Sequence, residues 1–274
     1  CGVRGTNRSQ AGVQKAEIVG GEPTIPLEFP WMVSIRLKEP IHGYKDHICG
    51  GSIINDQYVM TAAHCATIQD ASAENYVIVV GEQNIYANDS TEEWIDVEEV
   101  KEEHSITIHP KWDPQILNYD YAIMKLSRPL DFSGKEKNIM PICLPAANEI
   151  FTGKLCTASG WGVTMNGQCG TTANAALLKV NLPVIRLSTC KRDYKDVSDV
   201  YWKTMICAGY RNGGKSTCQG DSGGPLQCKS KKGFYVLTGM TSWGEICAAP
   251  HEPTVFARIA TQLDWIKSVA GETP

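Results

Sequence analysis

The sequence predicts an all-β fold, a sandwich or barrel, that ends in a single helix. From Ile18 onward, short runs of β-branched and aromatic residues alternate with Gly, Pro, Asn and Asp. Strands this short and this regularly interrupted are typical of sandwiches and barrels. The chain has 274 residues and is 42% hydrophobic, which is enough to bury a large core as one domain or two compact halves. The runs are residues 31–37, 52–54, 58–61, 76–80 and 234–240.

The two ends of the chain depart from this pattern. The first seventeen residues are polar, contain glycine and show no period, so we expect a flexible leader. Residues 263–270 have the apolar spacing of an amphipathic helix. Thr261 together with Asp264 would cap this helix, and Gly271 would end it.

Composition argues against several classes of function. A net charge of −4 without a long block of like charge is not the pattern of a nucleic-acid-binding protein. No apolar run approaches the roughly 18 residues of a membrane span. The chain opens on Cys1 without a signal peptide, as expected of a sequence that has already been processed. We therefore expect neither a nucleic-acid partner nor a membrane partner.

Eleven cysteines are scattered along the chain and do not form Cys-x-x-Cys pairs. This distribution argues against zinc ribbons and redox motifs, and it predicts a disulfide framework in an oxidising compartment. The sequons at Asn7 and Asn88 are compatible with a secreted, extracellular glycoprotein. An odd count leaves at least one thiol unpaired, or paired outside the chain.

Three residues suggest nucleophilic catalysis. Ser222 lies among glycines in residues 220–225, where a tight turn can present a hydroxyl and a backbone amide can approach a carbonyl. His64 lies beside small apolar residues, and Asp120 heads an apolar strand, where a buried carboxylate would hold an imidazole in one tautomer. Each feature alone also fits a glycine-rich turn, a core histidine or a strand-end cap. The three features together, in a chain with a predicted disulfide framework, are specific for nucleophilic catalysis.

The chain resembles chymotrypsin-family serine proteases in zymogen form, from Cys1 to the last helix. The resemblance implies two six-stranded antiparallel β-barrels with a C-terminal α-helix, and an active site in the crevice between the barrels. An activation peptide of residues 1–17 would precede a barrel of about residues 18–138, and then a barrel and helix of about residues 139–274. The matching motifs are residues 18–21, 49–52, 62–65, 120–123, 160–162, 220–225 and 242–244.

The resemblance also implies a mechanism. Ser222 would attack a peptide carbonyl while His64 takes its proton, and Asp120 would orient the imidazolium. The amides of Gly220 and Ser222 would form the oxyanion hole. This describes a monomeric endopeptidase that forms an acyl-enzyme and needs no catalytic cofactor. Its partners would be protein or peptide substrates, an activating protease and protein protease inhibitors.

Family matching further implies the disulfide pairing. Cys169 is left over in a segment that resembles a surface loop of the family; it is expected to be a tolerated free cysteine, with an intermolecular bond as the alternative. The expected pairs are Cys1–Cys143, Cys49–Cys65, Cys156–Cys228, Cys190–Cys207 and Cys218–Cys247.

Activation in the family depends on cleavage before Ile18, which frees an ammonium that pairs with Asp221. Until then, we expect a zymogen lock formed by Asp221, His47 and Ser34; the alternative is that His47 is an ordinary strand residue. An uncut chain should show Asp221 turned away from Ile18 and an incomplete oxyanion hole. Glu17 precedes the cut where most relatives have Arg or Lys, so the activator stays open.

The substrate-binding residues predict an uncharged pocket of intermediate depth. Ser216 occupies the floor position where trypsin-like enzymes carry aspartate, which disfavours Arg or Lys before the cut. Gly244 leaves the mouth open beside Ser242 and Trp243, while Thr254 replaces a glycine and shortens the slot. Leu, Met or smaller apolar residues should bind better than Trp, and cleavage after Phe or Tyr is a further alternative.

A structural calcium site is expected in the loop of residues 81–92. Calcium binds several oxygen ligands on one flexible loop. By resemblance to trypsin-like relatives, the ligands would be the carboxylates of Glu82 and Glu92, the carbonyls of Asn84 and Ala87, and Asp89 through water. The alternative is an acidic surface loop without an ion.

Two other functions stay open at this point. The chain could be a binding protein built on the protease fold, but such members usually lose one of the three catalytic residues and this chain keeps all of them. It could also be a trypsin-like regulatory protease, and Ser216 argues against that.

Overall fold

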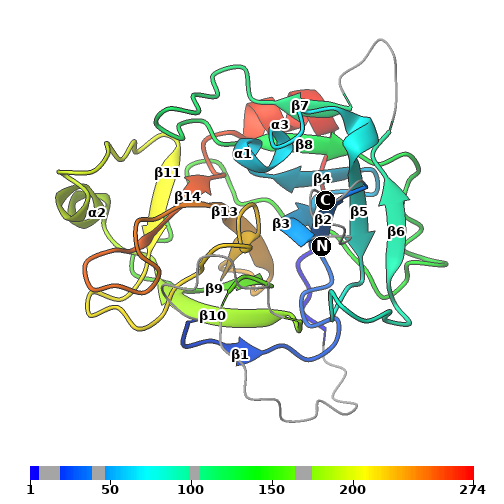
Figure 1. Cartoon of the computed structure of the whole chain (residues 1–274), viewed down its shortest axis with the longest axis horizontal. Coiled ribbons are helices and arrows are strands. Elements are labelled where there is room, and N and C mark those ends of the chain that lie inside the picture. Colours follow the sequence, from blue (N-terminus) through cyan, green and yellow to red (C-terminus); the bar gives the residue numbers. More distant parts are fainter. Residues whose placement is uncertain (6–18, 39–46, 99–104, 164–174) are drawn as a thin grey trace.

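The structure, a computed structural model, describes residues 1–5, 19–38, 47–98, 105–163 and 175–274. Within these residues the strands form two seven-stranded antiparallel sheets that lie side by side (Figure 1). The first sheet has the order β6-β5-β2-β3-β4-β8-β7. Its strands are β2 (Met32–Leu37), β3 (His47–Ile53), β4 (Tyr58–Thr61), β5 (Tyr76–Val80), β6 (Glu93–Asp96), β7 (Ile106–Ile108) and β8 (Ala122–Lys125).

The second sheet has the order β1-β10-β9-β12-β13-β14-β11. Its strands are β1 (Glu22–Pro23), β9 (Leu155–Gly160), β10 (Leu178–Pro183), β11 (Met205–Ala208), β12 (Pro225–Lys229), β13 (Tyr235–Trp243) and β14 (Thr254–Arg258). The described helices are α1 (Ala63–Ala66), the 3₁₀ helix η1 (Ala73–Asn75), α2 (Leu187–Asp193) and α3 (Leu263–Ala270). No described helix is long and apolar enough to cross a membrane.

Each sheet curls so that its ends approach each other. A bridge pairs Val97, next to β6, with Leu126, next to β8, and a second bridge pairs Val184 with Ala208. The prediction of an all-β fold with a C-terminal helix is confirmed. The predicted count of six strands per barrel is one short, because each sheet has seven. Strands as short as β1 and β7, with two and three residues, show too little alternation to be detected in the sequence.

The core explains why these segments form strands. Every residue of β2 and β5 is buried, so both strands are covered on both faces. β10 instead alternates: Val180 and Leu182 point into the second core while Asn181 is exposed.

One element from each half of the chain packs against the other half. β1 comes early in the chain, but it pairs with β10 at the edge of the second sheet. Conversely, α3 follows the second sheet and packs on the first, beside β7 and β8 (Figure 1). Ile266 and Ala270 of α3 are buried in the first core, and Asn55 Nδ2 donates a hydrogen bond to Ala270 O at 2.9 Å. Each half therefore helps to hold the other.

The predicted signals around α3 are correct in part. Gly271 follows the helix with φ 72°, a left-handed conformation that suits glycine. The predicted cap is wrong: Gln262 occupies the N-cap position without a side-chain cap bond. Thr261 Oγ1 donates instead to Lys203 O, because a backbone acceptor from the second half lies within reach.

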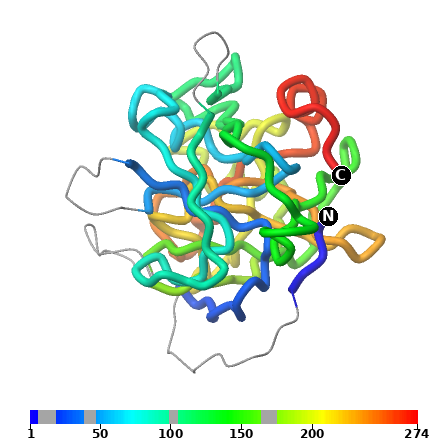
Figure 2. The backbone as a smooth tube through the Cα atoms, turned by 90° about the vertical axis from the view of Figure 1, so that its right-hand side faces the viewer, coloured from blue at the N-terminus to red at the C-terminus, as the bar shows by residue number. Residues whose placement is uncertain are grey.

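All five predicted disulfides are confirmed. They are Cys1–Cys143, Cys49–Cys65, Cys156–Cys228, Cys190–Cys207 and Cys218–Cys247. Cys1–Cys143 fixes the start of the chain to the body, where Gly2 exchanges backbone hydrogen bonds with Pro141 and Tyr235. The two termini consequently lie close together (Figure 2). Cys169, Asn7 and the bond between Glu17 and Ile18 lie outside the described residues.

Candidate active site

The two sheets bring together the three residues proposed for catalysis. His64 lies on α1, the short helix that follows β4 and begins among fully buried alanines. Asp120 lies just before β8, the strand next to β4, and both strands belong to the first sheet. Ser222 lies in the turn of residues 220–224 that leads into β12 of the second sheet.

Asp120 holds His64 with two hydrogen bonds, one to the imidazole and one to the backbone amide. Its Oδ2 lies 2.8 Å from His64 Nδ1, and its Oδ1 accepts the His64 backbone amide at 2.9 Å. Ser242 Oγ also donates to Asp120 Oδ2, at 2.6 Å. Asp120 is 2% exposed, and its carboxylate oxygens accept all three of these hydrogen bonds. In neutral His64 the proton therefore lies on Nδ1, which leaves a lone pair on Nε2 for a proton from a nucleophile.

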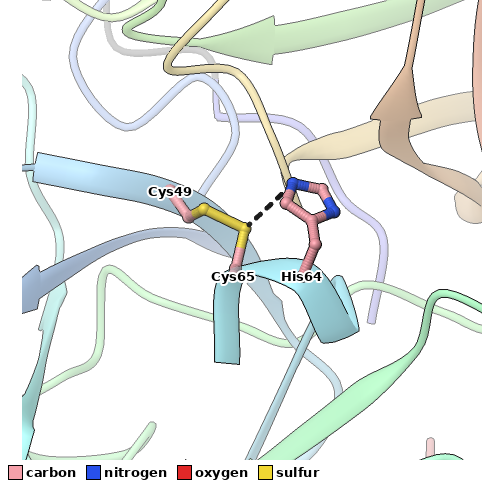
Figure 3. A group of neighbouring side chains, drawn as sticks. All are labelled: Cys49, His64 and Cys65. Carbon is pink, nitrogen blue, oxygen red and sulfur yellow. Dashed lines mark hydrogen bonds between the residues drawn. A yellow bond between two sulfur atoms is a disulfide. The ribbon is translucent and has the colours of Figure 1, made fainter. Parts of the chain in front are cut away.

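The free nitrogen of His64 faces a disulfide in this structure. Figure 3 shows Nε2 beside Cys65, with 3.6 Å between Nε2 and Sγ. Within the described residues, no hydrogen bond joins His64 to Ser222. Apo geometry of this kind often tightens only when substrate binds. The cluster of Cys49, His64 and Cys65 is not a metal site, because its two sulfurs are bonded to each other.

Glycines shape the turn that carries Ser222. Gly223 has φ 74°, and a Cβ there would lie 2.2 Å from Thr61 Oγ1 and 2.6 Å from Gly50 O. This close approach seats the turn against the first sheet, where the Gly50 amide donates to Ser222 O at 2.7 Å. The Gly223 amide donates to Thr241 O at 2.8 Å, which ties the turn to β13. The backbone around the nucleophile is therefore fixed from both sheets.

Two amides of this turn are available to a ligand. The amides of Asp221 and Gly223 are bonded to the carbonyls of Cys218 and Thr241. In the described part of the chain, the amides of Gly220 and Ser222 have no acceptor. A pair of neighbouring unpaired amides beside a serine is the donor arrangement that an oxyanion requires.

Asp221 is buried beneath the turn, and no cationic side chain among the described residues contacts it. Its Oδ1 accepts the Gly162 amide at 2.8 Å, and its Oδ2 accepts the Cys218 amide at 2.9 Å. A Cβ on Gly160 or Gly162 would overlap this carboxylate, at 2.2 and 2.5 Å. Burial raises the pKa of Asp221 to about 6, although the two amides oppose the shift. Ile18, the predicted partner, lies outside the described residues.

The predicted zymogen lock is formed only in part. Ser34 Oγ lies 2.9 Å from His47 Nδ1, as expected. His47 Nε2 does not contact the Asp221 carboxylate; it lies 2.9 Å from the carbonyl oxygen of Gly220. The reason is that both Asp221 oxygens are directed at the amides of Gly162 and Cys218. Burial, helped by the charge of Arg36, lowers the pKa of His47 to about 4, although the bond to Gly220 opposes this shift.

All five predicted substrate-binding residues line one hollow beside Ser222, of about 250 Å³. Its floor is closed by hydroxyl groups: Thr254 Oγ1 lies 3.0 Å from Ser216 Oγ and accepts from Thr217 Oγ1 at 3.1 Å. Ser216 Oγ is itself bonded to Thr217 O. The lining residues predicted from the sequence are Ser216, Ser242, Trp243, Gly244 and Thr254.

Two features of this hollow were not predicted from the sequence. Ser242 not only lines it but also donates to Asp120, which couples the pocket wall to the His64 ring. Glu252 contributes a carboxylate to the lining, and its Oε2 accepts the Ile246 amide at 2.6 Å. The position of Glu252 could have been marked from its closeness to Thr254 in the sequence, but not the direction of its side chain.

The predicted calcium loop brings three carboxylates together. Ligand oxygens of Glu82, Asp89 and Glu92 lie within 4.8 Å of one another. Glu82 Oε1 is buried and has no hydrogen-bond partner among the residues that the structure describes, while its Oε2 accepts from Arg36 Nη2 at 2.5 Å. Burial raises the pKa of Glu82 to about 7, against the effect of Arg36. Of the two predicted carbonyl ligands, that of Asn84 accepts the Ala87 amide at 3.0 Å.

The chain is similar to known proteases along most of its length. A family model described as Trypsin matches residues 18–266, which contain every residue of the candidate site. Trypsin-1 of Astacus astacus is 38% identical over 254 residues, which cover 92% of this chain and all of that relative. Serine proteinase stubble of Drosophila melanogaster is 34% identical over 94% of this chain, which spans only 32% of that longer protein.

The neutral state of half-buried His47 predicts a pH dependence of stability. Because its pKa is about 4 in the fold and about 6.5 in the unfolded chain, the folded state binds fewer protons between these values. Stability from this group is therefore present above pH 6.5 and is lost as the pH falls toward 4. In urea unfolding, His47→Gln should remove roughly 2 kcal/mol of the difference between pH 7 and pH 4.5.

The control is His251→Gln, since His251 is exposed and lies outside the site. Its unfolding free energy should follow the wild-type pH profile. A His47→Gln profile parallel to that of wild type would contradict the assignment of a neutral, half-buried ring.

Proposed function

Because the chain belongs to the trypsin family of serine proteases, we propose that it is a secreted endopeptidase that cleaves peptide bonds through an acyl-enzyme. The observation that carries the proposal is the pairing of His64 Nδ1 with buried Asp120, next to a serine turn with two unpaired amides. Homology supports proteolysis, and this geometry supports the particular residues.

The proposed mechanism uses only groups of this chain. His64 turns from the disulfide toward Ser222, and Nε2 takes the hydroxyl proton as Ser222 Oγ attacks the substrate carbonyl carbon. The oxyanion binds the amides of Gly220 and Ser222. His64 then gives its proton to the leaving amine as the carbon–nitrogen bond breaks. Water repeats the sequence: it loses a proton to His64, attacks the ester and releases the acid while Ser222 regains its proton.

We propose that the chain is a zymogen activated by cleavage between Glu17 and Ile18. Asp221 supports this role because it is a fully buried carboxylate whose partners in the described residues are the amides of Gly162 and Cys218. A new ammonium at Ile18 would give it a countercharge and lower its pKa. The proposed lock of the uncut form would need His47 to leave Gly220 O for the Asp221 carboxylate, because among the described residues no contact joins His47 to Asp221.

The pocket supports a preference for uncharged residues of intermediate size before the cut. Ser216 and Thr254 satisfy each other's hydroxyls at the floor, so the floor offers no carboxylate to a basic side chain. Thr254 fills space that a glycine would leave open. The second candidate is a trypsin-like preference for Arg or Lys. Glu252 favours it, because its carboxylate lines the same hollow.

The acidic loop fits a structural calcium ion. The unpartnered, buried Glu82 Oε1 is an acceptor without a donor, which is costly unless a cation binds it. Asp89 and Glu92 lie close enough to supply further oxygens, the ligand type that calcium prefers. Arg36 already neutralises part of the charge of Glu82. The ion would brace the loop and take no part in the chemistry.

Further proposals concern location and partners. Five disulfides support folding in an oxidising compartment, in keeping with secretion. Asn88 is exposed on the acidic loop and could carry a glycan. We propose a monomer that acts on proteins or peptides, needs an activating protease and is open to protein inhibitors.

The first test concerns the nucleophile. With residues 13–17 replaced by the site of a specific processing protease, the cleaved enzyme should be labelled at Ser222 by a fluorophosphonate. Ser222→Ala should lower kcat on a peptide substrate by about 10⁶-fold because the nucleophile is lost, and Asp120→Asn by about 10⁴-fold because the correct tautomer is lost. Ser268→Ala, on an exposed part of α3, is the matched control. A folded, cleaved chain without labelling at Ser222 would instead favour a binding protein.

The second test concerns the pocket. Thr254→Gly should raise kcat/KM for substrates with Phe before the cut by about tenfold relative to Leu, because the slot becomes deeper. The measurement is a peptide panel that varies only this residue. A wild-type enzyme with a strong preference for Arg, lost in Glu252→Gln, would overturn the proposed specificity.

The third test concerns calcium. Calcium at 100 times its Kd should stabilise the wild-type chain by about 2.7 kcal/mol, and Glu92→Gln should abolish this gain. Calorimetric titration and thermal unfolding with calcium or magnesium measure it. Glu74→Gln, at an exposed site outside the loop, should respond like wild type. Equal melting temperatures in calcium and in chelator would argue for a loop held by Arg36 alone.

A further inference from the structure

A chain of hydrogen bonds connects the acidic loop to the turn that carries Ser222. It begins at Glu82, whose Oε2 accepts from Arg36 Nη2 at 2.5 Å. Arg36 Nε donates to Ser34 Oγ at 3.3 Å. Ser34 Oγ and His47 Nδ1 lie 2.9 Å apart, and His47 Nε2 and Gly220 O also lie 2.9 Å apart. These five residues are here called the Arg36 relay.

The strands explain how the relay residues reach one another. Ser34 and Arg36 are two positions apart on β2 and therefore share one face of the sheet. The pairing of β2 with β3 is irregular at this point: Ile35 lies opposite Cys49, but Arg36 lies opposite His47. One residue of β3 is thus skipped, as in a β-bulge, and His47 is placed beside this face. β5, which leads into Glu82, is the neighbour of β2 on the other side (Figure 1).

The direction of the hydrogen bonds in the relay follows from its two ends. Gly220 O can only accept, so His47 Nε2 carries a proton. In the neutral ring, Nδ1 then accepts, and the proton of the Ser34 hydroxyl must point to it. Ser34 Oγ keeps its lone pairs for Arg36 Nε, which can only donate. Each group has one role: His47 Nδ1 accepts the proton of the Ser34 hydroxyl, and Arg36 Nε donates to a lone pair of Ser34 Oγ and so holds this oxygen in place.

Arg36 is itself held firmly. Its side chain is 5% exposed, and Nη2 also donates to Ile85 O at 3.1 Å. The guanidinium lies 4.8 Å from the centre of the Trp94 ring. A planar fork can bond Glu82 and Ser34 at the same time, which the single ammonium of a lysine does not reproduce.

The other end of the relay acts on Gly220. Its carbonyl belongs to the peptide that leads to Asp221, and its φ of 91° is a conformation that only glycine adopts readily. The amide end of this peptide, the Asp221 N–H, is bonded to Cys218 O, and His47 holds its carbonyl end. Without His47 the peptide would be held at one end only, and a tilt would move the neighbouring amides of Gly220 and Ser222 out of alignment. The carbonyl bond therefore fixes the pair of amides assigned to the oxyanion.

We propose that Arg36 is a positioning residue. Through Ser34 and His47 it fixes the position of the oxyanion-binding turn, residues 220–224, relative to the loop that carries Glu82. This inference rests on the proposed function, since it concerns the geometry of the same hydrolytic site. If Arg36 acts in this way, kcat depends on the conformation of the loop that carries Glu82.

The test is a double-mutant cycle on the cleaved enzyme. Arg36→Lys keeps the charge beside Glu82 but loses the fork, and Ser34→Ala removes the next group in the relay. Each should lower kcat about tenfold with less than a twofold change in KM, because oxyanion contacts form in the transition state. The double variant should be no slower than either single variant, since both remove the same interaction.

Arg128→Lys is the matched control. Arg128 also pairs with a buried glutamate, Glu136, at 2.7 Å, but it does not belong to the relay. Its kcat should stay within twofold of wild type. Active-site titration with a fluorophosphonate normalises every rate to folded enzyme, and Ser34→Ala alone decides the matter if Arg36→Lys does not fold.

The outcomes separate the relay from the function itself. A wild-type enzyme without activity or labelling overturns the proposed function. An active wild-type enzyme with additive losses in the double variant, an unchanged kcat in Ser34→Ala, or an equal loss in Arg128→Lys overturns the relay alone.

Discussion

The carboxylate of Asp120 is the interaction on which the site depends. It is buried between the two sheets and accepts hydrogen bonds from His64 on α1 and from Ser242 on β13. The next residue, Tyr121, extends the same junction, because its hydroxyl is bonded to the carbonyls of Thr204 and Arg258 in the second half. One carboxylate therefore sets the tautomer of His64 and also fixes how the first sheet meets the pocket wall.

Buried polar groups recur around this junction, and each has a specific compensation. Asp221 is stabilised by the amides of Gly162 and Cys218, and His47 stays neutral between Ser34 and Gly220. A buried charge or dipole without such partners would cost several kcal/mol. Glycine is required in the Ser222 turn for a packing reason, since a Cβ at Gly223 would displace the first sheet from the turn. The same residues thus serve both the packing of the two sheets against each other and the geometry of the candidate site.

Much of the site could be predicted because its residues lie in short, distinctive segments. The short β-branched and aromatic runs predicted the all-β fold. The resemblance carried by the segments around His64, Asp120 and Ser222 implied the disulfides and the pocket lining. The partner of His47 could not be predicted, because it depends on which amides the Asp221 oxygens meet in three dimensions. The contact between Arg36 and Glu82 joins residues 46 positions apart in the sequence, and no local pattern marks it. The predicted N-cap of α3 was wrong for the same reason, since Thr261 Oγ1 donates to Lys203 O, an acceptor 58 positions away in the sequence.

The central claim is that Ser222 is a nucleophile served by His64 and by the amides of its own turn. A crystal structure of the cleaved enzyme with a covalent phosphonate would test it most directly. We expect a bond from phosphorus to Ser222 Oγ, a phosphonyl oxygen within hydrogen-bond distance of the amides of Gly220 and Ser222, and His64 Nε2 turned away from Cys65 toward the adduct. A phosphonate attached elsewhere, or an oxygen directed away from both amides, would contradict it.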